Sequence, residues 1–310
     1  MLREAAESLA PSSTARRDAE LLLMRAARRD RAWLLTHAEA KLTPEQARQF
    51  EGWIVRRARQ EPVQYILGET EFFGLTLRVT PDVLIPRPET EHLVEAAIER
   101  LGMLAAPRIV DVGTGSGAIA VALARALPHA EVTALDISAA ALAVARENAE
   151  RHGVAGRMRF LESDLLEAVR GERFDAVVSN PPYVADAEVL EAQVAEYEPH
   201  TALFAGPTGL EVYRRLVPQA WEVLGPIPQG LKPHSFAPGY GTAEAVPFQS
   251  DADSSHAGSG GITRSQAGWL LMEIGHGQFE ALAQLLNGWN EVGFVQDLQR
   301  IPRVAVARWS

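Results

Sequence analysis

The four residues Asn180-Pro181-Pro182-Tyr183 have the side chains and the stiffness needed to hold a planar NH2 group. Pro181 has no N–H, and Pro182 restricts Pro181 to an extended conformation, so the loop is rigid and rich in acceptors. The side-chain oxygen of Asn180 and the carbonyl of Pro181 can each accept one hydrogen of the NH2, while Tyr183 offers a flat face. Such a clamp orients a nitrogen and stabilises positive charge as the nitrogen attacks an electrophile. Taken alone, the tetrapeptide is also typical of a turn that ends a strand.

A second stretch, Gly113-Thr114-Gly115-Ser116-Gly117, is typical of a loop that binds an adenosine-containing cofactor. Its glycines allow tight turns and close approach of a ligand between a strand and a helix. Asp136, about twenty residues further on, is placed to accept both hydroxyls of a ribose. We expect Asp164 to accept from the adenine amino group and Leu165 to pack on the ring. The glycine pattern also fits a dinucleotide fingerprint, so it leaves NAD open as the ligand.

The residues around both stretches alternate between strand and helix patterns. Strands are expected at 108–112, 131–135, 157–161, 174–179, 268–274, 294–298 and 304–309. Helices are expected at 90–101, 118–127, 138–152, 209–223 and 278–286. Short connections between such elements indicate parallel βαβ units, in which ligands bind beyond the carboxyl ends of the strands. Both chemical stretches follow expected strands, so they should share that edge.

The remaining chain divides by pattern into further segments. Residues 1–62 have helical periodicity and predict a small helical domain, in which Thr43-Pro44-Glu45-Gln46 should begin a helix with Thr43 as its cap. Residues 63–82 predict a β-hairpin linker, and residues 83–310 the main domain. Within it, Thr90 or Glu89 should cap a helix. Residues 225–267 lack an apolar period and are interpreted as a flexible insertion.

Composition limits the function classes further. The net charge is −10, which argues against direct, sequence-independent binding of nucleic acid. The chain has no cysteine, which excludes disulfides, thiolate metal sites and a cysteine nucleophile, and its eight histidines show no metal-ligand spacing. We expect no metal, and neither a secretory signal nor a membrane-spanning run is visible. The expectation is a cytoplasmic protein.

An adenosine site followed by an amino-group clamp describes a methyltransferase that uses S-adenosylmethionine. Asp111-Val-Gly-Thr-Gly-Ser-Gly-Ala-Ile-Ala and Ser179-Asn-Pro-Pro-Tyr resemble class I methyltransferases that modify nitrogen in amides or exocyclic amines. Three further stretches resemble the release-factor glutamine methyltransferases (the PrmC/HemK family). They are Glu61-Pro-Val-Gln-Tyr-Ile-Leu-Gly-Glu-Thr-Glu-Phe-Phe-Gly, Ile85-Pro-Arg-Pro-Glu-Thr-Glu and Glu196-Tyr-Glu-Pro-His-Thr-Ala-Leu-Phe-Ala-Gly.

This resemblance implies an α/β fold with a Rossmann-like, seven-stranded, mostly parallel sheet. It implies N5-methylation of the glutamine in the Gly-Gly-Gln motif of class I peptide chain release factors, a step tied to translation termination. The cofactor would be S-adenosyl-L-methionine, leaving S-adenosyl-L-homocysteine, and the helical domain would help to hold the release factor. We expect a monomer.

Residue by residue, the resemblance places the glutamine against Asn180, Pro181, Pro182 and Tyr183. Asn180, Pro181 and Tyr183 would be catalytic, with Asn180 also touching the cofactor. The cofactor would be lined by Gly113, Thr114, Gly115, Ser116, Gly117, Asp136, Asp164 and Leu165. The insertion at 225–267 is the main departure from the family pattern.

Other functions stay open at this point. The same clamp serves adenine-N6 methyltransferases of nucleic acid, which usually need a basic groove. An NAD-dependent oxidoreductase lacks a visible acid or base for hydride transfer. A non-catalytic adenosine-binding protein would not need the clamp. The roles of Glu89, Glu198 and Glu273 are not assigned by the sequence, because capping or surface charge explains each of them as well.

Overall fold

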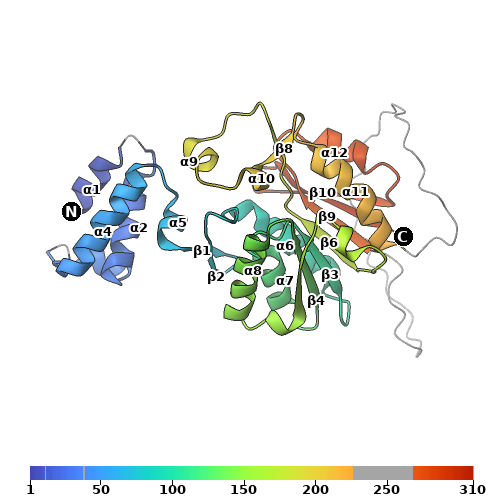
Figure 1. The fold of residues 1–310 in the computed structure, drawn as a ribbon, viewed down its shortest axis with the longest axis horizontal. Coiled ribbons are helices and arrows are strands. Elements are labelled where there is room, and N and C mark those ends of the chain that lie inside the picture. Colours follow the sequence, from blue (N-terminus) through green and yellow to red (C-terminus); the bar gives the residue numbers. More distant parts are fainter. Residues whose placement is uncertain (11, 38, 226–267, 310) are drawn as a thin grey trace.

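The computed structural model describes residues 1–10, 12–37, 39–225 and 268–309 (Figure 1). These residues form a helical domain, a short hairpin and a larger α/β part built on one wide sheet. In Figure 1 the helical domain stands to the left of the sheet, and the hairpin lies between them. The insertion expected at 225–267 lies, apart from Gly225, outside the described residues.

The helical domain is held together by apolar side chains that recur at helical spacing. Its helices are α1 (Leu2–Ser8), α2 (Ala15–Ala27), α3 (Arg31–Thr36), α4 (Pro44–Ala58) and α5 (Val63–Leu67). Leu22 of α2 and Phe50 of α4 lie in its buried core. The predicted start of α4 is confirmed, because the Thr43 hydroxyl accepts from the Gln46 N–H while the Gln46 side chain accepts from the Thr43 N–H. This reciprocal cap satisfies N–H groups that the first turn would otherwise leave unpaired.

The hairpin consists of β1 (Glu69–Phe72) and β2 (Leu75–Arg78), which pair antiparallel. The expectation that the β pattern extends back to residue 63 is wrong, because α5 occupies that stretch and ends at Gly68, which has a φ of 75°. Val63 and Ile66 are buried in the core of the helical domain, so tertiary packing outweighs local β propensity. Phe72 and Leu77 of the hairpin instead pack into the core of the α/β part.

The large sheet has seven strands in the order β10-β11-β9-β6-β3-β4-β5. They are β3 (Arg108–Val112), β4 (Glu131–Asp136), β5 (Met158–Glu162), β6 (Ala176–Ser179), β9 (Gly268–Glu273), β10 (Glu291–Gln296) and β11 (Pro302–Trp309). Within this sheet β11 runs in the direction opposite to the other six strands. The expected seven-stranded, mostly parallel sheet is confirmed.

Helices cover both faces of this sheet (Figure 1). One face carries α6 (Glu91–Leu101), α7 (Ala118–Ala126) and α8 (Ala139–Arg151), and the other carries α11 (Glu211–Leu224) and α12 (Phe279–Leu285). Ile109 of β3 packs into the cluster under α6 and α7, whereas its neighbour Val110 packs into the cluster under α11. Because both faces are covered, the central strands are continuous apolar runs, which explains why the sequence pattern locates them well.

The chain between Tyr183 and α11 contains short elements without a periodic sequence signal. They are β7 (Val184–Ala185), α9 (Ala192–Ala195), α10 (His200–Leu203) and β8 (Phe204–Gly206), and β7 pairs with β8. This segment reaches the helical domain through side chains of its own. The Tyr197 hydroxyl donates to the main-chain carbonyl of Arg59 at 2.7 Å, and Arg57 Nη2 donates to Gln193 Oε1 at 3.3 Å.

Among residues 1–225 and 268–309, apart from residues 11 and 38, no helix is long and apolar enough to cross a lipid bilayer. The same described residues include no group of three or more His, Cys, Asp or Glu side chains that could hold a metal ion.

Candidate active site

The two stretches singled out in the sequence lie next to each other at one edge of the sheet. The glycine-rich loop follows β3, and Asn180-Pro181-Pro182-Tyr183 follows β6. These strands are parallel neighbours in which Val112 pairs with Ser179. The Ser179 hydroxyl also donates to the Val112 carbonyl at 2.7 Å. Gly113 and Asn180 therefore start side by side, at the carboxyl ends of two adjacent strands, where open α/β folds bind ligands.

The glycine loop has a backbone that only glycine adopts without strain. Gly113, Gly115 and Gly117 have φ values of 71°, 54° and 79°. A Cβ placed on Gly113 or Gly115 would meet no atom within 4 Å, so the backbone there is open to a ligand. A Cβ on Gly117 would lie 3.0 Å from that of Ala145 in α8. The third glycine therefore allows α7 and α8 to pack closely, while the first two keep the loop accessible.

The hydroxyl residues of the loop point into the protein. Thr114 and Ser116 are 6% and 3% exposed. The Thr114 N–H donates to the Leu135 carbonyl at 2.9 Å, which fastens the loop to the end of β4. The Ser116 carbonyl accepts from Asn148 Nδ2 at 2.8 Å. The contact of these two residues with a cofactor stays a prediction. Because their side chains are buried, the contact would have to use main-chain atoms or require a small movement of the loop.

Asp111, at the end of β3, is a site residue to which the sequence pattern assigned no role. Its side chain is completely buried, and Oδ2 accepts from the Thr114 hydroxyl at 2.7 Å. Its other oxygen, Oδ1, has no hydrogen-bond partner among the described residues. Burial raises the pKa of this carboxyl to about 7, and the hydrogen bond from the Thr114 hydroxyl opposes that rise. An unpaired buried carboxylate oxygen is costly, so a cationic group bound beside it would be stabilised.

Asp136, at the tip of β4, links that strand to the glycine loop. Its Oδ2 accepts from the Gly115 N–H at 2.8 Å and its Oδ1 from the Ser138 N–H at 2.9 Å. Burial raises the pKa of Asp136, while these amides oppose the rise. A carboxylate has about four acceptor positions, so Asp136 keeps the capacity to accept two further hydroxyl hydrogens.

Asp164 and Leu165 lie after β5, next to α11. The Asp164 carboxylate is half-exposed and forms an ion pair with Arg215 at 2.5 Å. Leu165 is half-buried and has a φ of 52°, a conformation that a leucine adopts only under local constraint. The Ser163 hydroxyl donates to the Leu165 carbonyl at 2.9 Å and supports this conformation. The predicted contacts of both residues with adenine stay predictions, and Arg215 competes for the Asp164 carboxylate.

The Asn180 side chain is bonded to Thr90, which the sequence predicts as a helix cap. Its Nδ2 donates to the Thr90 hydroxyl oxygen at 3.1 Å, whereas its Oδ1 accepts no hydrogen bond from the described residues. The expectation that the Thr90 side chain caps α6 is wrong, because Thr90 makes no side-chain cap and is 3% exposed, facing Asn180. Glu89 makes no side-chain cap either. The amide oxygen of Asn180 is thus available as an acceptor.

The residues that follow Asn180 in the loop are fixed by contacts with other parts of the chain. Pro181 is buried, and its carbonyl is not an acceptor for any described donor. The Tyr183 carbonyl accepts from Gln278 Nε2 at 3.0 Å, and the same nitrogen donates to the Gly209 carbonyl at 3.2 Å. The Tyr183 ring lies over Gly275, where a Cβ would come within 2.9 Å of Cδ2. Burial raises the pKa of Tyr183 to about 12, so its phenol stays neutral.

Glu89, Glu198 and Glu273, whose roles the sequence left open, have three different environments. Glu89 is exposed. Glu198 is buried, accepts from the Ile85 N–H at 3.1 Å and pairs with Arg87 Nη2 at 2.5 Å, so it has a structural role. Glu273, at the end of β9, is 3% exposed, and its Oε2 has no partner among the described residues. Burial raises the pKa of Glu273 to about 7.

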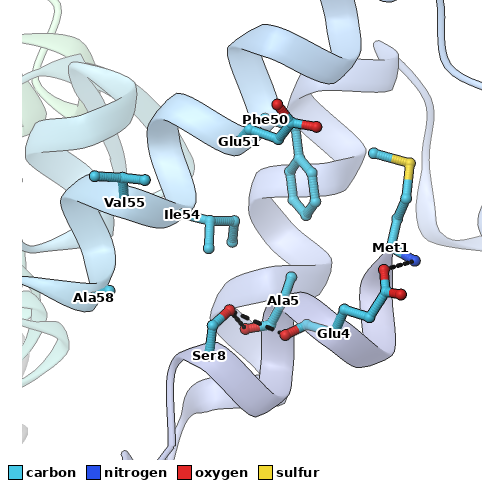
Figure 2. A pocket seen from close by; sticks show the side chains of 9 residues that line it. All are labelled: Met1, Glu4, Ala5, Ser8, Phe50, Glu51, Ile54, Val55 and Ala58. Atoms are coloured by element: carbon cyan, nitrogen blue, oxygen red, sulfur yellow. Dashed lines mark hydrogen bonds and ion pairs between the residues drawn. The ribbon is translucent and has the colours of Figure 1, made fainter.

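A separate hollow lies in the helical domain (Figure 2). It is a cavity of about 340 Å³ between α1 and α4, with Ala5, Phe50 and Ile54 on its walls. Glu4, on its rim, is paired with the amino group of Met1 at 2.9 Å. The hollow brings together apolar walls rather than convergent polar groups, so the chemistry is to be sought at Asn180.

Comparison with known proteins agrees with this arrangement. The family model described as "Methyltransferase small domain" matches residues 90–197, and the one described as "PrmC N-terminal domain" matches residues 1–68. The chain is 40% identical over 308 residues to a release factor glutamine methyltransferase of Koribacter versatilis, covering 98% of this chain and 94% of the relative. It is 40% identical over 298 residues to that of Geobacter sulfurreducens, covering 95% and 89%.

Solved structures support the fold. The catalytic domain of hMettl16, in complex with the MAT2A 3'UTR hairpin 6, matches with a TM-score of 0.51 at 15% identity, covering 86% of this chain and 81% of that chain. The 16S rRNA N2 G1207 methyltransferase of T. thermophilus, in complex with AdoMet and guanosine, matches with a TM-score of 0.50 at 19% identity, covering 78% and 50%. The family resemblance carried by the sequence motifs is confirmed by the relatives, and the chain belongs to the release factor glutamine methyltransferase family.

Proposed function

We propose that this protein transfers a methyl group from S-adenosylmethionine to the side-chain amide nitrogen, N5, of the glutamine in the Gly-Gly-Gln motif of class I peptide chain release factors. Membership of the family supports this substrate. The observation that supports the proposal most strongly is the pairing of Val112 with Ser179, because the glycine loop and Asn180 then begin side by side. The product of the cofactor would be S-adenosylhomocysteine.

The residues around the glycine loop fit this cofactor. The open backbone at Gly113 and Gly115 admits a ligand, and the unpaired Asp111 Oδ1 suits the ammonium group of the methionine part. Asp136 has acceptor capacity for the two ribose hydroxyls. Thr114, Ser116, Gly117, Asp164 and Leu165 complete the proposed lining, the last two toward the adenine. When bound, S-adenosylmethionine supplies a methyl carbon that its sulfonium already activates for displacement.

The clamp then has to align the acceptor nitrogen. Asn180 Oδ1 and the Pro181 carbonyl each accept one hydrogen of the glutamine NH2, so one side-chain and one main-chain oxygen set the nitrogen's position. Pro182 keeps this loop stiff, and the Tyr183 ring packs along the amide plane. Alignment of this kind supplies much of the acceleration in an in-line displacement. The two acceptors also stabilise the positive charge that develops on nitrogen.

The clamp needs no strong base. An amide nitrogen becomes acidic once it bonds to the methyl carbon, so its proton can leave to water afterwards. Tyr183 is unsuited to act as a base because its pKa of about 12 keeps it protonated at neutral pH. A neutral Asn180 therefore suffices, and no side chain of the clamp has to act as a base.

The proposal also assigns a role to each part of the chain. The helical domain, residues 1–62, would recognise the release factor, residues 63–82 would link it, and residues 83–310 would carry the reaction. The protein would act as a cytoplasmic monomer on a protein substrate, without direct contact with nucleic acid. Oligomeric state in solution can be checked by light scattering.

The experiment for the proposed function compares three acceptors in parallel. The protein is incubated with methyl-labelled S-adenosylmethionine and with a release factor, the same factor with Gly-Gly-Ala in place of Gly-Gly-Gln, or duplex DNA. We expect label in the first reaction alone, and a gain of one methyl mass on the peptide that contains the glutamine. Equal labelling of the Gly-Gly-Ala variant, or labelling of the DNA, would contradict the assignment.

Gly209→Ala tests whether the support beneath the clamp matters. A Cβ at Gly209 would overlap the Tyr183 carbonyl oxygen, so the loop that contains Tyr183 has to shift. Because misplacement by about 1 Å can cost on the order of 100-fold in rate, we expect kcat to fall at least about tenfold. The matched control is Gly277→Ala, since Gly277 has a similar φ of 81° but a Cβ there meets nothing within 4 Å. Equal loss of kcat in both variants would mean that backbone strain alone explains the effect.

A further inference from the structure

The stretch that leads into α6 is fixed by a buried acid from a distant part of the chain. Residues 84–87, all of which the structure describes, belong to no helix or strand. Glu198 is 4% exposed, and its Oε2 accepts from the Ile85 N–H at 3.1 Å. Its Oε1 accepts from Arg87 Nη2 at 2.5 Å. Both carboxylate oxygens of Glu198 therefore bind the lead-in to α6, residues 84–90.

This lead-in is stiff and poor in backbone donors. Pro86 and Pro88 bring no N–H, and each proline restricts its own φ and the conformation of the residue before it. A segment of this kind bends little, so a contact at one end also places the other end. Glu198 contacts residues 85 and 87, and Thr90 follows three residues later.

Thr90 connects the lead-in to the clamp, residues 180–183. Its N–H donates to the Arg87 carbonyl at 3.1 Å, which closes the turn that precedes α6. Its hydroxyl oxygen accepts from Asn180 Nδ2 at 3.1 Å, and Thr90 is 3% exposed, so little water reaches this bond. A continuous series of contacts therefore runs from Glu198 through Arg87 and Thr90 to Asn180.

Glu198 is itself held in place, because the segment that carries it is attached to the helical domain. The hydroxyl of its neighbour Tyr197 donates to the Arg59 carbonyl at 2.7 Å. Gln193 Oε1 accepts from Arg57 Nη2 at 3.3 Å. The acid thus lies between two anchored parts of the molecule and provides a fixed support for the lead-in.

We propose that Glu198 and Arg87 are positioning residues, which hold Thr90 where its hydroxyl binds Asn180 and so keep the clamp in place. Neither residue has to touch the glutamine or the cofactor. The attraction within a buried ion pair is largely offset by desolvation, so the pair fixes one geometry more than it adds stability. This inference rests on the proposed function for the use of Asn180, but the position of Thr90 is a property of the protein without substrate.

The first measurement is hydrogen exchange on the protein alone, followed by NMR at the amides of Ile85 and Thr90. Glu198→Ala removes both acceptors, so we expect the Ile85 amide to exchange at least about tenfold faster through local opening. The decisive amide is that of Thr90, which Glu198 does not bind, and we expect its exchange to rise at least about fivefold as the lead-in loosens. An unchanged Thr90 amide would overturn the proposal, whatever the substrate proves to be.

The second measurement is methyl transfer to a release factor at saturating cofactor. We expect Glu198→Ala to lower kcat about 30-fold, because misplacement by about 1 Å can cost on the order of 100-fold. The Kd for S-adenosylmethionine should change less than about threefold, since the glycine loop makes no contact with Glu198. Glu172→Ala is the matched control, because Glu172 also accepts from an arginine, Arg108, but at the opposite end of the sheet. Wild-type kcat in Glu198→Ala would overturn the proposal.

Glu198→Gln makes the test independent of whether Glu198→Ala folds. Glutamine has nearly the same shape but one acceptor oxygen, so it can bind Ile85 or Arg87 and not both. We expect intermediate effects on the Thr90 amide and on kcat, with a melting temperature, measured by calorimetry, that stays above the assay temperature. A folded Glu198→Gln with wild-type values of both would contradict the proposal.

A double variant separates positioning from a general loss of structure. If Glu198 acts through Thr90, then Thr90→Val already removes what Glu198 contributes to kcat. Glu198→Ala combined with Thr90→Val should therefore fall no more than about threefold below Thr90→Val alone, whereas independent effects would multiply. Multiplication of the two losses would mean that Glu198 acts by another route, and the proposal would fail.

Discussion

Replacing Asn180 with alanine is expected to lower kcat for methyl transfer to a release factor by about 1000-fold. Removing a single group that stabilises developing charge in a buried site costs on the order of 100- to 1000-fold. Asn180 also aligns the nitrogen, so the larger figure applies. Affinity for S-adenosylmethionine should stay within a few fold of wild type, because the glycine loop, Asp111 and Asp136 are unchanged.

Single-turnover kinetics with labelled cofactor give the rate, and calorimetric titration gives the affinity. Asn287→Ala is the matched control, since Asn287 is an exposed asparagine beyond α12 and outside the site. If Asn180→Ala turned over at the wild-type rate, the amide clamp would not be part of the reaction. If it lost cofactor binding to the same degree as turnover, Asn180 would act on the cofactor rather than on the glutamine.

The second large effect is expected at Asp111. Asp111→Asn keeps the shape and the acceptor for Thr114, but it replaces the unpaired oxygen with an NH2 or removes its charge. Hydrogen bonds to charged groups contribute about 1.5–3 kcal/mol, which corresponds to roughly 10- to 100-fold in affinity. We expect the Kd for S-adenosylmethionine to rise by about 100-fold, because the substituted amide also points a donor at an ammonium group. Asp175→Asn, at the opposite end of the sheet, should leave the Kd unchanged.

The pH dependence of cofactor binding has a definite sign. Burial raises the pKa of Asp111 to about 7 in the folded protein, so the carboxylate is lost as the pH falls through that value. Wild-type affinity should weaken toward acid, whereas Asp111→Asn should bind weakly at every pH. The raised pKa also means that ionisation destabilises the folded state, progressively from about pH 4 to pH 7. Without cofactor, Asp111→Asn should therefore melt at a higher temperature than wild type above pH 7, which scanning calorimetry can measure.

The sequence could locate most of the sheet, for a physical reason. Strands such as β3 and β6 are buried on both faces, so they are written as uninterrupted apolar runs with glycine or proline at their ends. Glycines at 113, 115 and 117 could be interpreted because a positive φ strongly limits the choice of residue. The Thr43 cap could be predicted because all its partners lie within three residues.

The parts that sequence reasoning missed depend on partners far away in the chain. Thr90 has the features of a helix cap, but its hydroxyl oxygen instead accepts from Asn180 Nδ2, 90 positions later in the chain. Nothing local distinguishes Glu273, with an unpaired oxygen, from Glu198, which is fully engaged with Ile85 and Arg87. Asp111 is the first residue of the glycine-rich stretch, but the sequence does not show that it is completely buried, and its burial is what indicates a role.

Packing also sets the boundary between the helical domain and the hairpin. Residues 63–67 contain Val, Tyr and Ile, which favour strands locally. Val63 and Ile66 instead find a place in the core of the helical domain, and the stretch becomes α5. The elements between Tyr183 and α11 have four residues or fewer each, too short to show a period at all.

The contact between Tyr197 and Arg59 bears on how such a protein can change over evolutionary time. The acceptor is the main-chain carbonyl of residue 59, and the exposed arginine side chain contributes nothing to that bond. Mutations can alter the character of residue 59 and still leave the oxygen that Tyr197 binds, because every amino acid brings the same carbonyl. The side chain at position 59 is thus free to diverge, while the hydrogen bond that joins this residue to Tyr197 is inherited intact.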